Sequence, residues 1–327
     1  MKDELPVVEP RSSRWVAYLQ LFRAPNVFTA VADVTMGCLF VRHALQPWES
    51  WLALVCASAL LYTAGMVLND VYDADIDGRE RPGRPLPSGR ISVRWARRLG
   101  FRLLAGGVLL GVCGGWLGVG GLESAARSGL MAGALAACVW LYDARLKSTL
   151  VGPLVLGACR ALNVLLGMSL GGTSHPAAGL VNYEAIQWLV AGGIGVYVTG
   201  VAWYARGEAT ISRRIPLLVG LALMIGGVLM LATFPRLGPA TSRYFMEPTL
   251  IWPFALLILM LPTLRRSLIG VFDPRPRRVQ AAVKQSLFSL IVLDAAVCLL
   301  VSPWPYAVGV LALLLPAILL GRWVYST

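Results

Sequence analysis

An apolar helix pattern over Trp51–Leu68 leads directly into Asn69-Asp70-Val71-Tyr72-Asp73-Ala74-Asp75-Ile76-Asp77, which places four carboxylates in eight residues. At 100° per residue, the side chains that share roughly a 100° arc of one helix face are Asn69, Asp70, Asp73 and Asp77. Asp75 points the opposite way. Carboxylates on one face repel one another unless a cation lies between them. Because oxygen ligands suit a hard ion, the pattern predicts a Mg²⁺ site made by Asp70, Asp73 and Asp77.

A strongly basic loop follows the acidic stretch. It contains Arg79, Arg81, Arg84 and Arg90, and its Arg-Pro-Gly-Arg-Pro-Leu-Pro-Ser-Gly sequence cannot continue a helix. Mg²⁺ held by few carboxylates usually completes its coordination with water and substrate phosphates. An acidic segment followed by an arginine-rich loop at a membrane surface therefore predicts a site that binds a metal ion and a diphosphate. The competing interpretation is that the acidic segment is simply the solvated end of a membrane helix.

The composition is that of a polytopic membrane protein. Of 327 residues, 57% are apolar and only 14% are charged, and the mean hydropathy is +0.67. A soluble protein of this length needs far more polar surface. We therefore expect an all-α, polytopic membrane helical bundle of nine to ten transmembrane helices, formed by a single domain over residues 15–327 after a cytoplasmic tail at residues 1–14. The candidate membrane spans are roughly 15–42, 48–69, 97–118, 126–143, 150–170, 182–205, 215–234, 249–268, 280–302 and 304–324.

Basic residues lie almost entirely on one side of a chain with ten spans. The formal net charge of +12 would suit a nucleic-acid partner, but its distribution argues against one. One side carries Lys2, Arg11, Arg14, the loop Arg79–Arg98, Arg145, Lys147, Arg206, Arg213, Arg214, the run Arg265–Lys284 and Arg322, and the other only Arg42, Arg127, Arg236 and Arg243. This asymmetry follows the positive-inside rule and predicts that both termini and the acidic stretch are cytoplasmic. The expected partners of these cations are membrane lipid headgroups and not nucleic acid.

Two motifs carry a resemblance to a known family. The pattern N-D-x-x-D-x-x-x-D over Asn69–Asp77, followed by Arg84-Pro85-Leu86-Pro87-Ser88-Gly89-Arg90-Ile91-Ser92, resembles the first signature of the UbiA superfamily of intramembrane prenyltransferases. The segment Leu21–Asn26 is similar to the start of the family's first helix. The resemblance implies a bacterial inner membrane protein of nine helices, so the hydrophobic segment 305–323 is surplus. It also implies Mg²⁺ as cofactor, and transfer of an isoprenoid chain from a prenyl diphosphate to a small acceptor, aromatic or lipid-like.

The resemblance also implies roles for individual residues. Asp70, Asp73 and Asp77 are expected to hold Mg²⁺, and Lys147 and Arg160 complete the predicted catalytic set. The residues predicted to bind substrate are Arg23, Asn26, Asn69, Arg81, Arg84, Tyr142 and Asn163. Arg84 in particular is expected to clamp a phosphate with two hydrogen bonds, a geometry that guanidinium groups favour.

Two of these cations lie far from the first motif in sequence. Tyr142 and Lys147 resemble the family's tyrosine-then-lysine segment, although their spacing is one residue longer than the commonest form. Arg160 lies inside a hydrophobic segment, where a cation is costly and usually has a functional partner. We expect Arg160 to face the active cavity, or alternatively to form a structural pair with Asp33 or Asp294.

The chain departs from the family at the second acidic motif, which usually ends the sixth helix. The corresponding segment, Tyr197–Glu208, contains no aspartate. Together with Cys159-Arg160-Ala161-Leu162-Asn163, this departure is similar to the EboC-like branch of the superfamily. If cations replace the second metal, at least one of Lys147, Arg160 and Arg206 should approach the acidic stretch closely enough to share one diphosphate. The alternative function is a non-catalytic membrane component that binds or transports an isoprenoid or a secondary-metabolite precursor.

Overall fold

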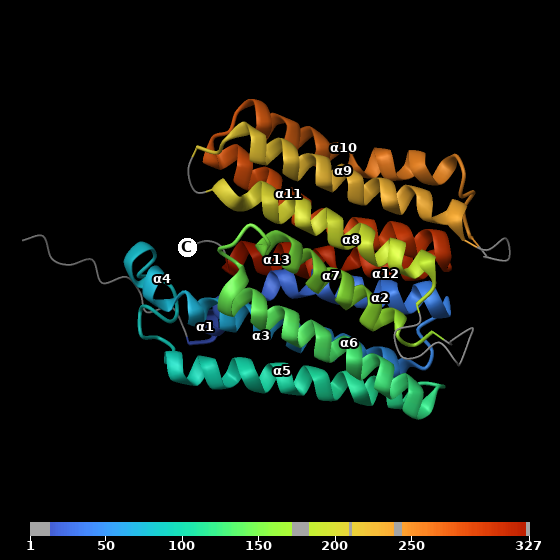
Figure 1. Ribbon diagram of the computed structural model, residues 1–327, viewed down its shortest axis with the longest axis horizontal. Helices are drawn as coiled ribbons and strands as arrows, with labels where there is room; N and C mark the ends of the chain where they lie inside the picture. Colours follow the sequence, from blue (N-terminus) through green and yellow to red (C-terminus); the bar gives the residue numbers. More distant parts are fainter. Residues whose placement is uncertain (1–13, 172–182, 209–210, 239–243, 325–327) are drawn as a thin grey trace, which may run out of the picture.

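The structure, a computed structural model, describes residues 14–171, 183–208, 211–238 and 244–324 (Figure 1). Lys2, Arg11, Arg243 and the predicted tail at residues 1–14, apart from Arg14, lie outside these ranges. The helical elements are α1 (Arg14–Leu21), α2 (Ala24–Arg42), α3 (Trp48–Tyr72), α4 (Ala74–Glu80), α5 (Val93–Trp116), α6 (Gly121–Leu141), the π turn η1 (Tyr142–Leu146), α7 (Gly152–Met168), α8 (Ala185–Tyr204), the 3₁₀ turn η3 (Ala205–Gly207), α9 (Arg214–Leu237), α10 (Ile251–Phe272), α11 (Pro276–Val301), α12 (Trp304–Ala312) and α13 (Leu314–Val324).

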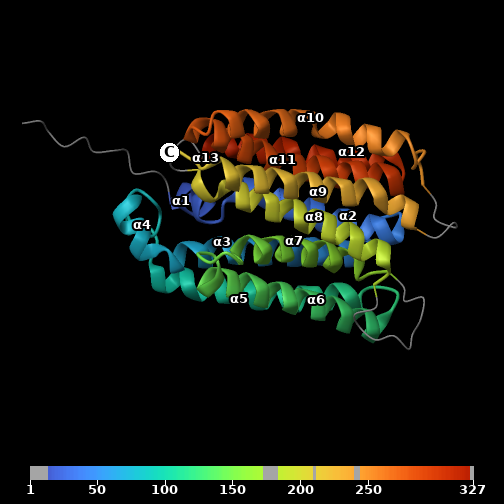
Figure 2. The same cartoon turned by 45° about the horizontal axis from the view of Figure 1, so that its top comes forward.

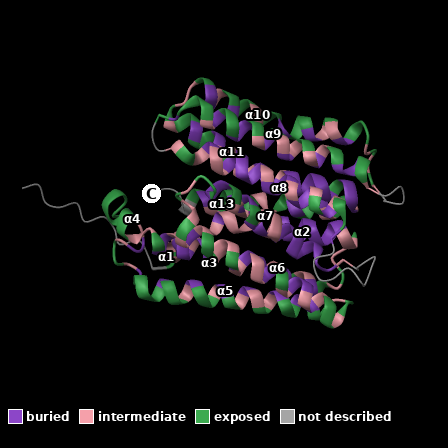
Figure 3. Cartoon of the chain, in the orientation of Figure 1, coloured by how far each residue is buried: buried purple, intermediate pink, exposed green. Residues whose placement is uncertain are grey.

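These elements form an all-α membrane bundle, which confirms the predicted fold class. Within the described ranges, nine helical segments are long and apolar enough to cross a membrane, and α7 is a shorter apolar helix of 17 residues. Buried residues concentrate along α2 and α8, whereas exposed residues are frequent along α5 and α10 (Figure 3). Exposed leucine and isoleucine side chains on α10, such as Leu257 and Ile258, are expected of a surface that faces lipid.

The long helices form a closed ring. Each packs against the next from α2 to α11, except for the short α4, and α11 packs back against α2. The ring is filled, because α7 also packs closely against α2. Gly37 and Gly167 permit this contact: a Cβ at Gly37 would lie 2.3 Å from the Val164 carbonyl oxygen, and one at Gly167 would lie 2.2 Å from the Val34 carbonyl oxygen. Small residues at such crossings let membrane helices approach closely.

Two predicted spans are each broken into two helices. The span predicted at 15–42 is interrupted at Arg23, because Pro25 has no N–H to donate to the Leu21 carbonyl. The span predicted at 304–324 is divided into α12 and α13, since Pro316 likewise cannot donate to the Ala312 carbonyl. Both places nevertheless contain a helical segment long and apolar enough to cross a membrane, Ala24–Arg42 and Trp304–Arg322, with one break before the first and the other within the second. α12 packs on α11 and α13 on α2, and α1, α4 and α13 lie toward the same end of the bundle (Figure 1).

Candidate active site

The acidic stretch crosses a bend between two helices. α3 and α4 meet at Asp73, which adopts φ −92° and ψ 0°, and both views show α4 turned away from the axis of α3 (Figures 1 and 2). The predicted single helix face is therefore wrong, because the bend changes the direction of the helix at Asp73. Helical hydrogen bonds nevertheless persist on both sides, from the Asp73 N–H to Asn69 (3.0 Å) and from the Asp77 N–H to Asp73 (2.8 Å). Asp70 and Asp77 are buried, and Asp75 is exposed.

Two arginines hold a first pair of carboxylates. Arg84 Nη1 lies 2.5 Å from Asp77 Oδ2 and 3.7 Å from Asp70 Oδ1, so one guanidinium bridges two acids. Arg23 Nη2 donates to Asp70 Oδ1 at 3.2 Å. A planar guanidinium pairs with carboxylate and phosphate oxygens in the same way. Arg23 and Arg84, two of the three arginines predicted to bind substrate, are thus directed at carboxylate oxygens that were predicted to bind Mg²⁺.

A small hydrophobic cluster positions the loop that carries Arg84. Its buried members come from α1, α3, this loop and α5, and they are Ala17, Leu21, Val67, Val71, Leu86, Ile91 and Ala96. Arg90 braces the same loop by donating to one of its backbone carbonyls at 2.6 Å. Arg23, between α1 and α2, adopts a left-handed conformation with φ 44°. This conformation is uncommon for a residue with a Cβ, and such strain concentrates at functional sites.

Lys147 reaches the acidic stretch from the connection between α6 and α7. In η1, the Lys147 N–H donates to the Tyr142 carbonyl at 2.9 Å, which closes a π-helical turn. A π turn contains one residue more than an α turn, so it accommodates the longer spacing between Tyr142 and Lys147. Lys147 Nζ forms an ion pair with Asp73, and Tyr142 interacts electrostatically with Asp73 and Arg23. The structure thus brings Lys147 to the carboxylates, as the sequence predicted, while its catalytic role stays a prediction.

Asp143 lies at the same site, although the sequence did not single it out. It belongs to η1, its residue is only 3% exposed, and its Oδ1 accepts a hydrogen bond from Asn69 Nδ2 at 3.3 Å. The charged groups close enough to interact with it electrostatically are Lys147, Asp73, Arg23 and Asp70. An acid inside an otherwise basic loop, directly after a motif tyrosine, is the sequence signal that could have identified it.

Arg160 belongs to a second polar cluster inside the bundle. Its guanidinium donates to Asp33 Oδ2 at 2.7 Å and to Thr29 Oγ1 at 2.6 Å, and it lies 5.4 Å from the centre of the Tyr62 ring. Asn163 donates to the same Asp33 oxygen at 3.3 Å. Of the two arrangements that the sequence left open for Arg160, the structure therefore has the pair with Asp33. Arg160 and Asn163 are both directed at this acid and not at the acidic stretch.

The other predicted residues lie around the rim of the site. Arg206 donates to the Thr149 carbonyl, so it is directed at the α6–α7 connection and not at the carboxylates. Burial raises the pKa of Glu208, and the charge of the exposed Arg81 opposes that rise. Arg81 is therefore close enough to Glu208, which follows α8, for their charges to interact. Asn26 is half-buried in the first turn of α2.

The carboxylates are not gathered into a ready metal site. Among the residues that the structure describes, no three histidine, cysteine, aspartate or glutamate side chains are close enough together to hold a metal ion. Each predicted ligand is held by a basic side chain instead: Asp70 by Arg23, Asp77 by Arg84 and Asp73 by Lys147. These cations lie beside the oxygens that a metal ion would contact, and they offset the repulsion between the carboxylates.

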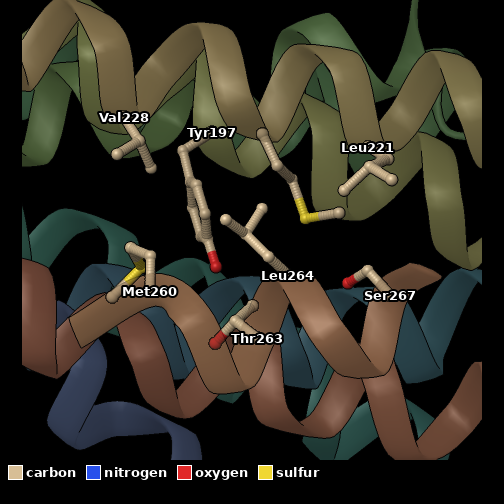
Figure 4. Close-up of a pocket in the computed structure, with 8 residues that line it drawn as sticks. Tyr197, Leu221, Val228, Met260, Thr263, Leu264 and Ser267 are labelled. Atoms are coloured by element: carbon tan, nitrogen blue, oxygen red, sulfur yellow. The ribbon is translucent and has the colours of Figure 1, made fainter. Parts of the chain in front are cut away.

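The cavity shown in Figure 4 is separate from this site. It lies between α8, α9 and α10, where Tyr197 points toward the α10 side chains Thr263 and Leu264 (Figure 4). Its volume of about 10 Å³ is that of roughly one water molecule, which excludes an isoprenoid or a diphosphate. The acidic stretch, with the arginine and lysine side chains paired to it, is the candidate active site.

The fold and the site together define a membrane-embedded protein with a cluster of arginine, lysine and carboxylate side chains at one end. A sequence model described as the UbiA prenyltransferase family matches residues 30–280. A protein of Methanopyrus kandleri named digeranylgeranylglyceryl phosphate synthase is 30% identical over 251 residues, which cover 75% of this chain and 84% of that protein. The chain belongs to the UbiA prenyltransferase family, whose members are intramembrane prenyltransferases.

Two further comparisons agree with this assignment. A protein of the same name from Ignicoccus hospitalis is 35% identical over 158 residues, so the matched part of the chain spans about half of that relative, 48% of its length. The structure of a UbiA homologue from Archaeoglobus fulgidus bound to DMAPP and Mg²⁺ has a TM-score of 0.56 and 16% sequence identity. That comparison covers 90% of this chain and 99% of the homologue, and it shows a shared fold.

Proposed function

We propose that this protein transfers an isoprenoid chain from a prenyl diphosphate to a small, lipid-like acceptor in a Mg²⁺-dependent reaction. The observation that carries the proposal is the placement of Arg23, Arg84 and Lys147 against Asp70, Asp73 and Asp77 at one end of the membrane bundle. The names of the two relatives support a lipid-like acceptor over an aromatic one. The proposal includes a single catalytic domain over residues 15–327, with its site and both termini in the cytoplasm. A bacterial inner membrane stays a prediction, since both relatives are archaeal.

The residues present fit a magnesium ion. Asp70, Asp73 and Asp77 offer only carboxylate oxygens, which are the ligands that Mg²⁺ prefers. A bound Mg²⁺ would neutralise the charge that develops on the leaving diphosphate. With the carboxylates occupied by Mg²⁺, the side chains of Arg23, Arg84 and Lys147 would be available to the phosphate oxygens.

The side chains of the site then favour cleavage of the C1–O bond of the prenyl diphosphate. Arg84 and Arg23 would bind the phosphates through paired hydrogen bonds, and Lys147 would supply a third positive charge. Such fixed donors stabilise a transition state because negative charge grows on the oxygens at which they point. The bond electrons leave with the diphosphate, the acceptor hydroxyl oxygen forms the new bond to C1, and the hydroxyl proton passes to the departing diphosphate.

The test is turnover by the full-length protein in lipid nanodiscs. With Mg²⁺ and geranylgeranyl diphosphate, we expect release of diphosphate and a product whose mass is the acceptor plus one geranylgeranyl chain. Geranylgeranylglyceryl phosphate and 4-hydroxybenzoate, supplied separately, distinguish the lipid-like acceptor from the aromatic one. Tight binding of the prenyl diphosphate without diphosphate release from any acceptor would favour the non-catalytic alternative.

Lys147→Ala is expected to weaken binding of geranylgeranyl diphosphate by about 10- to 100-fold, because one charge-assisted contact to phosphate contributes about 1.5–3 kcal/mol. Binding of geranylgeraniol, which lacks the diphosphate, should change much less. Isothermal titration of both ligands measures the difference. Arg145→Ala is the matched control, since Arg145 lies in the same turn and is exposed. Equal losses for the two variants would mean that the loop attracts anions without a specific contact from Lys147.

A further inference from the structure

A cavity of about 240 Å³ lies at the end of the bundle opposite to the candidate active site. Its lining comes from the last residue of α2, the connection between α5 and α6, the first turns of α6 and residues 169–171 after α7. α2 begins beside Arg23 and ends at this cavity, and α6 begins at the cavity and runs into η1. Both views show α4 at one end of the bundle and the connection between α5 and α6 at the other (Figures 1 and 2). In the orientation proposed above, the cavity therefore lies toward the outer face of the membrane.

Two arginines from different helices line this cavity. Arg42 is the last residue of α2, and Arg127 lies in the second turn of α6. They are two of the four basic residues that the charge pattern places on this side of the membrane. Basic residues are scarce on the outer side of membrane proteins, so the convergence of two of them on one cavity favours a role in binding an anion.

Arg127 is buried at a position where a cation is costly. The residue is 3% exposed and belongs to an apolar helix. Its Nη1 donates to the Gly171 carbonyl at 2.9 Å, and its guanidinium lies 4.1 Å from the centre of the Tyr183 ring. These two contacts orient the guanidinium and leave its positive charge in place. An ionisable side chain buried within a membrane protein usually marks a functional site.

The cavity has a buried floor and an exposed rim. Arg127 and Ser169 are buried, whereas Val119 and Glu123 are exposed. Among the described residues, Glu123 is the one acid in the lining, and it lies in the first turn of α6, where the positive end of the helix dipole offsets its charge. A ligand with one negative charge would bring Glu123 and the two arginines to neutrality.

The surroundings of the cavity favour a phospholipid as the source of that anion. The end of α5 and the connection to α6 expose four apolar side chains, Trp116, Leu117, Val119 and Leu122. Such a group suits the boundary between lipid and water, where tryptophan is enriched. The cavity, at about 240 Å³, is smaller than the sites of about 300–1,000 Å³ that hold drug-sized ligands, so it fits a headgroup and not a whole lipid.

We propose that Arg42 and Arg127 bind the phosphate group of an anionic phospholipid, such as phosphatidylglycerol, in this cavity. Arginine suits this role because its guanidinium can donate two parallel hydrogen bonds to phosphate oxygens. The headgroup occupies the cavity, and the acyl chains lie along the exposed apolar side chains between α5 and α6. This binding goes beyond the proposed reaction, since it requires neither Mg²⁺ nor a prenyl diphosphate.

Lipid binding in the absence of Mg²⁺ and prenyl diphosphate tests the proposal. We would count the phosphatidylglycerol molecules retained by the full-length protein in native mass spectrometry, and repeat the titration with phosphatidylcholine, whose headgroup has no net charge. Arg42→Gln and Arg127→Gln should each weaken the binding of one phosphatidylglycerol molecule by about 10- to 100-fold. Binding of phosphatidylcholine should not change.

Arg236→Gln is the matched control, because Arg236 is predicted on the same side, is exposed and donates to the Thr249 carbonyl. Cations at the active-site end are the same in all of these proteins, so only the differences between them report on the cavity. Arg42 is half-buried at the end of its helix, and its variant gives a result even where Arg127→Gln does not fold. Unchanged phosphatidylglycerol binding in Arg42→Gln, or an equal loss in Arg236→Gln, would overturn the site.

Inorganic phosphate separates the two sources of the anion. At millimolar concentration it should not displace phosphatidylglycerol from the wild-type protein, because it has no acyl chains to add to the contacts of the phosphate group. Displacement that is absent from Arg42→Gln would show that the cavity takes free phosphate, and would overturn the lipid as its ligand. Diphosphate release from a prenyl diphosphate tests the proposed function separately from either result.

Discussion

Asp77→Ala is expected to lower kcat/KM for Mg²⁺-dependent diphosphate release by about 100- to 1000-fold, because it removes a metal ligand and the anchor of Arg84 together. Arg84 Nη1 lies 2.5 Å from Asp77 Oδ2, so without this acid the guanidinium loses the partner that aims it into the site. The same variant should bind geranylgeranyl diphosphate no more tightly with Mg²⁺ than with EDTA. Turnover in nanodiscs and titration with and without Mg²⁺ measure both effects.

The membrane fold of Asp77→Ala should persist. The guanidinium left behind is partly exposed, and Asp70 still lies 3.7 Å from Arg84 Nη1, so the variant creates no buried charge without a partner. The sequence suggested another reason, relief of repulsion among carboxylates, but the structure shows each of them paired with a cation. Asp75→Ala is the control, because that side chain is exposed on the same short helix. If Asp75→Ala lost as much activity as Asp77→Ala, the assignment of the ligands along α4 would be contradicted.

Features that depend on neighbouring residues were well predicted from the sequence. Runs of apolar residues predicted the spans, and the spacing of Asp70, Asp73 and Asp77 with the following Arg84 predicted a cluster of opposite charges that the structure contains. Both patterns are local, because hydrophobicity and charge act over a few residues. The break before α2 was also readable, since Pro25 removes a helical N–H donor. It was overlooked because hydrophobicity runs on without interruption across Arg23.

Features that depend on packing were beyond the sequence. The bend at Asp73 has no proline or glycine to mark it, and the loop around Leu86 and Ile91 is held by α1 and α5. Asp143 is 70 or more residues from most of its partners, and only the packing of α6 against α3 brings it to Asn69. The partner of Arg160 could not be predicted for the same reason. Helical periodicity places a residue on one face of its helix, but it does not identify the helix that packs against that face.

Arg160 is expected to stabilise the packing of the helices and not to contact the diphosphate. Its guanidinium lies 2.7 Å from Asp33, and Asp294 of α11 is close enough to interact electrostatically with both Asp33 and Arg160, so the cluster joins α2, α7 and α11. Replacing both Asp33 and Asp294 with asparagine leaves a buried guanidinium that cannot lose its proton. The free energy of unfolding should fall by about 3–5 kcal/mol, as expected for a buried charge without its partner. Denaturant unfolding in detergent micelles, followed by tryptophan fluorescence, measures the loss.

Adding Arg160→Met to that double variant should restore much of the lost stability, because the uncompensated charge is gone and methionine fills most of the same space. The triple variant also separates the two roles of Arg160. If the arginine only braces helices, diphosphate release per folded molecule should stay within about threefold of wild type, a change in barrier well below 1.4 kcal/mol. A triple variant that is stable but inactive would instead show that this cluster contacts substrate. A double variant as stable as wild type would contradict the proposal that the ion pair of Arg160 stabilises the bundle, since burial of a charged guanidinium without a carboxylate should lower the free energy of unfolding.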